Sequence, residues 1–126
     1  MSREPIADQT WDRIQAEFGL PTLEQVSRRL SELHEDPQTV IQQLVRIFID
    51  EGTYCPGFQF TSALRLRPTV LALFRRAMEL RIPHNYFTVW MITPSMHAEG
   101  ARPVDLLDSP IQPLMRLLEE SAIGLS

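Results

Sequence analysis

Residues 85–118, NYFTVWMITPSMHAEGARPVDLLDSPIQPLMRLL, carry the most informative pattern of this chain. Their first part places four large apolar side chains at i, i+1, i+4 and i+5, which predicts a helix with one apolar face. These side chains are Tyr86, Phe87, Trp90 and Met91. Asn85 is expected to cap this helix, and Thr93-Pro94 to end it, because the residue before a proline avoids the α region. In the loop that follows, Gly100 indicates a positive φ or a close backbone approach.

The end of the same stretch predicts a second amphipathic helix. Its apolar side chains recur every three to four residues, at Ile111, Leu114, Met115, Leu117 and Leu118. Two starting points are open, one near Ser109-Pro110 and one at Pro113 itself, since a proline suits only the first turn of a helix.

The earlier part of the chain predicts further helices and one exception to the helical pattern. Apolar periodicity predicts helices at residues 8–18, 22–33, 37–49 and 68–82. Thr22 with Gln25 forms a capping-box pattern, and Asp36-Pro37 supplies an N-cap followed by a first-turn proline. In the 68–82 helix the apolar stripe contains Val70, Leu71, Phe74, Ala77 and Met78.

The fold class predicted from these elements is all-α. We expect a compact bundle of about five to six short helices with one short extended segment near residues 53–60, TYCPGFQF, where Phe58 and Phe60 anchor the core. At 126 residues the chain is one domain's worth, so 1–126 is expected to be a single domain. Within it, residues 1–51 form a helical N-terminal part and residues 52–126 carry the more distinctive motifs.

The helices expected at 22–33 and 37–49 also suggest a degenerate helix-turn-helix. The candidate DNA-binding residues are Arg28, Arg29, Gln38, Gln42, Gln43 and Arg46. Two observations weigh against this reading and favour plain helical packing: the second helix carries a single arginine, and the spacing between the helices is about one turn longer than the compact motif needs.

Basic residues gather in the middle of the chain. Residues 61–81 contain five arginines, Arg65, Arg67, Arg75, Arg76 and Arg81, against one acid, Glu79. A solvated helix face is the first explanation, and a patch for an acidic partner or for DNA phosphate is the second. The net charge of the whole chain is −4, which is a poor basis for nonspecific DNA binding.

Composition excludes several other classes. With 44% hydrophobic and 22% charged residues the chain resembles an ordinary globular protein, and it contains no apolar run long enough to span a membrane. The first residues lack the pattern of a signal peptide, so a cytoplasmic location is expected. Cys55 is the only cysteine, and His34, His84 and His97 are widely spaced, so we expect neither a metal site nor a cofactor. No nucleophile, phosphate-loop or metalloprotease motif is found, and we do not expect an enzyme.

One pattern carries a family resemblance. The chain combines Trp90-Met91, Thr93-Pro94, Gly100, Arg102-Pro103 and Leu106-Leu107 with the upstream motif Cys55-Pro56-Gly57-Phe58-Gln59-Phe60. Over roughly residues 52–122 this resembles the toxin-binding domain of the Xre/MbcA/ParS antitoxins, bacterial proteins paired with RES-domain toxins.

The resemblance implies a non-catalytic inhibitor that covers the cleft in which a RES toxin consumes NAD. The expected toxin-binding residues are Thr93, Pro94, Met96, His97, Gly100, Arg102, Pro103 and Arg116. It further implies a homodimer that represses its own operon by binding an operator. Trp90, Leu106 and Leu107 are expected to lie in the core instead. The alternatives are a DNA-binding transcriptional regulator and a helical adaptor without either partner.

Overall fold

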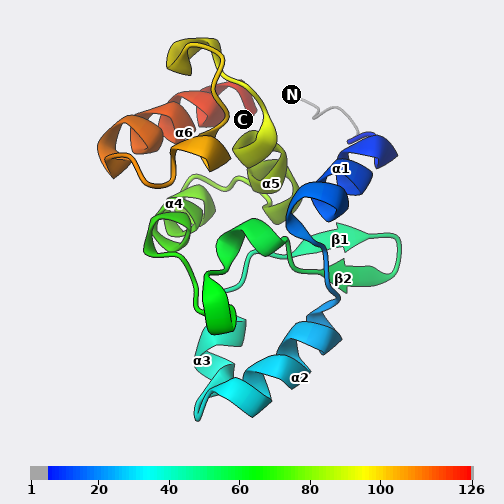
Figure 1. Cartoon of the computed structure of the whole chain (residues 1–126). Coiled ribbons are helices and arrows are strands. Elements are labelled where there is room, and N and C mark those ends of the chain that lie inside the picture. Colours follow the sequence, from blue (N-terminus) through cyan, green and yellow to red (C-terminus); the bar gives the residue numbers. More distant parts are fainter. Residues whose placement is uncertain (1–5, 126) are drawn as a thin grey trace.

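The chain folds into helices around one short β-hairpin, as a computed structural model describes for residues 6–125 (Figure 1). The α-helices are α1 (Asp8–Phe18), α2 (Leu23–Leu33), α3 (Pro37–Gln42), α4 (Pro68–Glu79), α5 (His84–Ile92) and α6 (Ile111–Leu125). The hairpin pairs β1 (Ile47–Ile49) with β2 (Gly52–Tyr54) in antiparallel register, and short 3-10 turns are η1 (Gly57–Gln59), η2 (Ser62–Leu64), η3 (Met96–Ala98) and η4 (Pro103–Leu106). The predicted mostly helical fold is confirmed. Within residues 6–125, no helix is both long and apolar enough to cross a membrane.

The largest apolar cluster lies between α4, α5 and α6. Phe87, Leu73 and Leu118 are fully buried in it, and Phe74 is only 6% exposed, as its place in the predicted stripe requires. Trp90, Leu106 and Leu107 pack against this cluster while remaining partly exposed. In Figure 1 α4 lies between α6 and the α2–α3 pair.

Helix α1 packs against the hairpin and η1, whereas α2 packs against α3 and η2. Trp11 and Ile14 of α1 form a second cluster with Ile47 of β1. The capping box at Thr22 is present, with reciprocal hydrogen bonds of 2.9 and 3.0 Å to Gln25.

Gly57 touches the end of α1, and a Cβ atom at this position would collide with the carbonyl oxygen of Phe18. Glycine is required at position 57 because the backbone at the end of α1 lies too close to leave room for a Cβ atom.

The helix predicted over residues 37–49 is wrong beyond its first half. α3 ends at Gln42, and Ile47 and Phe48 belong to β1. The sequence from 45 to 49, VRIFI, is rich in β-branched and aromatic residues, which favour a strand.

Two carboxamide side chains hold this non-helical segment in place. Gln59, 1% exposed, accepts a hydrogen bond from the Val45 N–H (2.8 Å) and donates to the Val45 carbonyl (2.9 Å) and the Pro56 carbonyl (3.1 Å). Asn85 does the same for Phe48, accepting from its N–H and donating to its carbonyl, both at 2.9 Å. Asn85 is therefore not the N-cap of α5 as predicted, a position that Pro83 occupies. Each amide takes the place of a neighbouring strand along the segment.

The other helix boundaries differ from the predicted ones by a few residues. α4 stops at Glu79 and is followed by Arg81 at φ 62°, where the Ile82 N–H binds the Ala77 carbonyl in a Schellman-type ending. Met78 is 37% exposed and does not belong to the core as predicted. α6 begins at Ile111, with Pro113 in its first turn.

Candidate functional site

The loop between α5 and η4 is closed on itself by backbone hydrogen bonds. Ser95 N–H donates to the Ala101 carbonyl (3.0 Å), and Gly100 N–H donates to the Ser95 carbonyl (2.8 Å). Glu99 and Gly100 both have positive φ, 56° and 86°. Of the two alternatives predicted for Gly100, positive φ is therefore the correct one, since no atom lies within 4 Å of where its Cβ would be. These backbone hydrogen bonds hold the two ends of the loop together in a defined conformation.

Two neighbouring residues of this loop, Met96 and His97, are exposed to solvent. The Met96 side chain is 94% exposed, and His97 is exposed beside it. The Ser95 hydroxyl accepts a hydrogen bond from the His97 N–H at 3.2 Å, which fixes the turn that presents them. A methionine side chain is flexible and polarizable, so at this exposed position it can adapt its shape to a partner.

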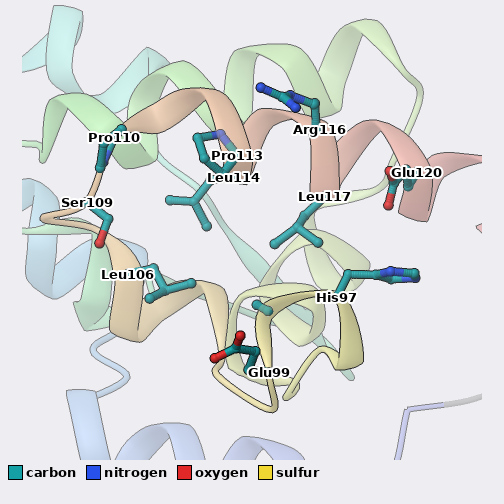
Figure 2. A pocket seen from close by; sticks show the side chains of 11 residues that line it. His97, Glu99, Leu106, Ser109, Pro110, Pro113, Leu114, Arg116, Leu117 and Glu120 are labelled. Carbon is teal, nitrogen blue, oxygen red and sulfur yellow. The ribbon is translucent and has the colours of Figure 1, made fainter.

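An open groove of about 600 Å³ lies between this loop and α6 (Figure 2). We call it the loop–α6 groove; its lining residues are His97, Ala98, Glu99, Leu106, Ser109, Pro110, Pro113, Leu114, Arg116, Leu117 and Glu120. Leu114 and Leu117 point from α6 toward the loop, and Leu106 of η4 meets them from the opposite side.

Charged groups of both signs surround this apolar floor. Arg116, Glu99 and Glu120 are exposed, and none of them forms an ion pair with another residue in 6–125. Arg116 and Glu120 are one turn apart on α6, while Glu99 comes from the loop. These charges are available to a partner, and the groove offers apolar contact together with hydrogen bonding.

The structure brings only some of the expected toxin-binding residues into the groove. His97 and Arg116 line it, and Met96 stands next to it. Thr93, Pro94 and Gly100 are exposed outside the groove, and Pro103 is buried. Glu99, Leu106 and Glu120 also line the groove, although they were not among the expected toxin-binding residues. Glu120 could have been found from the sequence, because it follows Arg116 by four residues and so lies on the same face of the helix.

Arg102 is engaged within the chain. Its guanidinium donates to both carboxylate oxygens of Glu17 (2.8 and 2.6 Å) and to both of Asp105 (2.9 and 2.9 Å), and it lies 5.9 Å from the ring centre of Phe18. These hydrogen bonds, those to Glu17 foremost, raise the pKa of Arg102, and they lower the pKa of both carboxyls. With its side chain 25% exposed, Arg102 joins α1 to η4. Arg102 therefore holds the end of the loop, where η4 begins, against α1.

The residues expected to bind DNA do not form a recognition helix. Arg28 is paired with Glu24 at 3.2 Å and Arg29 with Glu32 at 3.0 Å, all on α2. Gln38 and Gln42 are exposed on α3, which has only six residues, and Gln43 lies at its C-terminal cap.

Arg46 lies beyond α3, so its predicted place on that helix is wrong. Its guanidinium donates to the Ile41 carbonyl at 2.9 Å, and its backbone N–H donates to Nδ1 of His84 at 2.9 Å. Burial, followed by the charge of Arg46, lowers the pKa of His84. His84 thus serves as a neutral acceptor that links α5 to the start of β1.

Cys55 is fully buried, and burial raises the pKa of its thiol to about 11. A thiol in this state is unsuited to nucleophilic chemistry. Within residues 6–125, no group of three His, Cys, Asp or Glu side chains is placed to hold a metal ion.

Comparison with known proteins adds no assignment: no family model, curated protein or solved structure matches this chain.

Proposed function

We propose that this chain is an antitoxin of a bacterial toxin–antitoxin pair, which neutralises a RES-domain toxin by binding through the loop–α6 groove and Met96. The proposal rests on one observation, which is that the loop with the antitoxin-like motif also lines a groove. The loop that holds the Thr93-Pro94 and Gly100 elements of the antitoxin-like pattern is the wall of an open apolar groove. Of the residues that the resemblance implies, His97 and Arg116 line this groove and Met96 lies next to it, and these three support the proposal.

The physical properties of this surface suit a protein partner. Burying the Met96 side chain in an interface contributes about 1.5–3 kcal/mol, roughly ten- to a hundredfold in affinity. The loop is already closed by the Ser95–Ala101 hydrogen bond, so little conformational entropy is lost when it binds. Unpaired charges at Arg116 and Glu120 supply orientation.

Inhibition in this proposal is steric. The chain binds over the cleft in which the toxin consumes NAD and itself supplies no reacting group, so the proposal requires no catalysis by this chain. A toxin that consumes NAD acts inside the cell, which places this chain in the cytoplasm. Operator binding and homodimer formation rest on the family resemblance alone.

The test is co-expression with a RES-domain toxin encoded beside the gene for this chain. Wild type is expected to co-elute with the toxin and to relieve its growth arrest. Met96→Glu and Arg116→Glu are each expected to weaken the complex about tenfold or more, since one removes an apolar anchor and the other reverses a charge.

Leu33→Glu is the matched control. Leu33 is 40% exposed on α2, away from the groove, and its replacement should leave co-elution and rescue unchanged. The proposal fails if wild type neither binds nor rescues, or if the groove variants bind as wild type does.

A further inference from the structure

A second groove of about 600 Å³ borders α4 and has no part in the function proposed above. We call it the α4 groove. Its lining residues are Gln42, Gln43, Leu71, Ala72, Phe74, Arg75, Arg76, Met78, Glu79 and Met115. It shares no lining residue with the loop–α6 groove, and Met115 is its single contribution from α6.

The floor of the α4 groove is apolar and adaptable. Leu71, Ala72 and Met115 are partly buried, and Met78 is 37% exposed. Methionine side chains adjust their shape to a partner, and two of them in one groove are typical of surfaces that receive an amphipathic helix.

Among the residues that line the groove, Arg75 and Arg76 are basic and Glu79 alone is acidic. Arg76 donates from Nε and Nη2 to Glu119 (3.1 and 2.9 Å) and from Nη1 to Glu79 (3.4 Å), and these hydrogen bonds, those to Glu119 foremost, raise the pKa of Arg76. Arg75 is exposed and forms no ion pair with any residue in 6–125. The groove therefore presents one unpaired guanidinium.

Hydrogen-bonding groups complete the rim. The carboxamides of Gln42 and Gln43 make no side-chain hydrogen bond to any other residue of the described chain. Together with Arg75 they offer donors to carboxylates or to backbone carbonyls beside an apolar floor. Gln42 and Gln43, which are distant from α4 in the sequence, thus line the same groove as Arg75 and Arg76 of α4.

We propose that the α4 groove binds an acidic amphipathic helix of a partner protein, with the helix's apolar side chains on the floor and a carboxylate on Arg75. Charge complementarity selects an acidic partner, because the lining residues carry two arginines against one glutamate and Arg75 has no ion-pair partner among residues 6–125. A nucleic acid fits less well, since strong DNA binding requires several free cations and gains nothing from the floor around Met78. This surface is independent of the toxin, so its test does not depend on the proposed function.

The probe is a fluorescein-labelled helical peptide of about four turns, with leucines at i, i+3, i+4 and i+7 and glutamates on the flanks. Fluorescence anisotropy is measured with the full chain at low and at physiological salt. The acidic peptide is expected to bind, and its counterpart with lysines in place of glutamates to bind at least fivefold more weakly.

Arg75→Glu should weaken binding of the acidic peptide about fivefold and reverse the preference between the two peptides. Met78→Glu should weaken it further through loss of the apolar floor. Arg28→Glu on α2 changes the net charge by the same amount and should leave binding unchanged. Circular-dichroism melts confirm that the variants remain folded.

Three results would overturn the proposal. One is equal binding of the acidic and basic peptides to wild type. The second is a loss of binding in Arg116→Glu but not in Arg75→Glu, which would move the peptide to the loop–α6 groove. The third is displacement of the peptide by a DNA duplex that itself binds in an Arg75-dependent way.

Discussion

Replacing Gln59 by leucine should destabilise this protein more than its position in a short 3-10 turn would indicate. The substitution keeps a similar volume and removes the carboxamide that binds the N–H and carbonyl of Val45 and the carbonyl of Pro56. Gln59 and Val45 are both 1% exposed, so water cannot replace the lost hydrogen bonds.

The size of the effect follows from the groups left without partners. A buried backbone N–H or carbonyl that loses its hydrogen bond costs about 1–3 kcal/mol, and Val45 has one of each. The free energy of unfolding should therefore fall by about 2–6 kcal/mol, a large part of the 5–15 kcal/mol that is usual for a domain. At about 4 °C per kcal/mol for a chain of this size, Tm should fall by about 8–24 °C.

The assay is urea unfolding followed by circular dichroism, with Asn85→Leu as the matched control. Asn85 makes the same pair of hydrogen bonds to Phe48, but at an exposed place where water can take over. The control should therefore lose only about 1–2 kcal/mol. A loss below about 1 kcal/mol for Gln59→Leu, or equal losses for the two variants, would refute the reasoning that desolvation sets the cost.

Three further predictions concern titration, ion pairing and thiol reactivity. The folded-state pKa of His84 lies below its unfolded value, so its contribution to stability is present above about pH 6.5 and is lost as the pH falls; the slope of stability against pH between 7 and 5 should become smaller in His84→Asn, measured by urea unfolding. Arg102→Met should lower stability by about 1–2 kcal/mol at low salt and by less in 1 M NaCl, because the lost network with Glu17 and Asp105 is partly exposed; an equal loss at both salt concentrations would contradict an ionic origin. Cys55 should react with a thiol reagent at pH 8 at least a hundredfold more slowly in the folded protein than in urea, and comparable rates would contradict its burial.

Local sequence signals predicted the elements whose stabilising contacts are local. The capping box at Thr22 joins residues three apart, and the cap at Asp36 does the same for α3. The positive φ at Gly100 follows from the residue type. Such features need no knowledge of the tertiary fold.

The sequence predictions were wrong where residues distant in the sequence determine the local structure. Val45 is held by an amide 14 residues away, and Phe48 by one 37 residues away, so the segment after Gln42 becomes extended although its apolar spacing suits a helix. Asn85 is a good N-cap by type, but the backbone of Phe48 competes for its side chain.

The candidate site divides in the same way. The exposure of Met96 and the amphipathic character of α6 could be anticipated from the residues themselves. The role of Arg102 could not, because Glu17 lies 85 residues away in the sequence. Likewise, the groove exists only because Leu106 packs opposite α6, which is a property of the tertiary fold.

The central claim, that the loop–α6 groove is the surface that binds the toxin, is tested most directly by amide hydrogen exchange on the chain alone and in complex with the RES-domain toxin. The account predicts slower exchange in the complex over residues 95–100 and 111–120, with α2 unchanged. Protection confined to α2 and α3, with the loop and α6 exchanging as in the free chain, would contradict it.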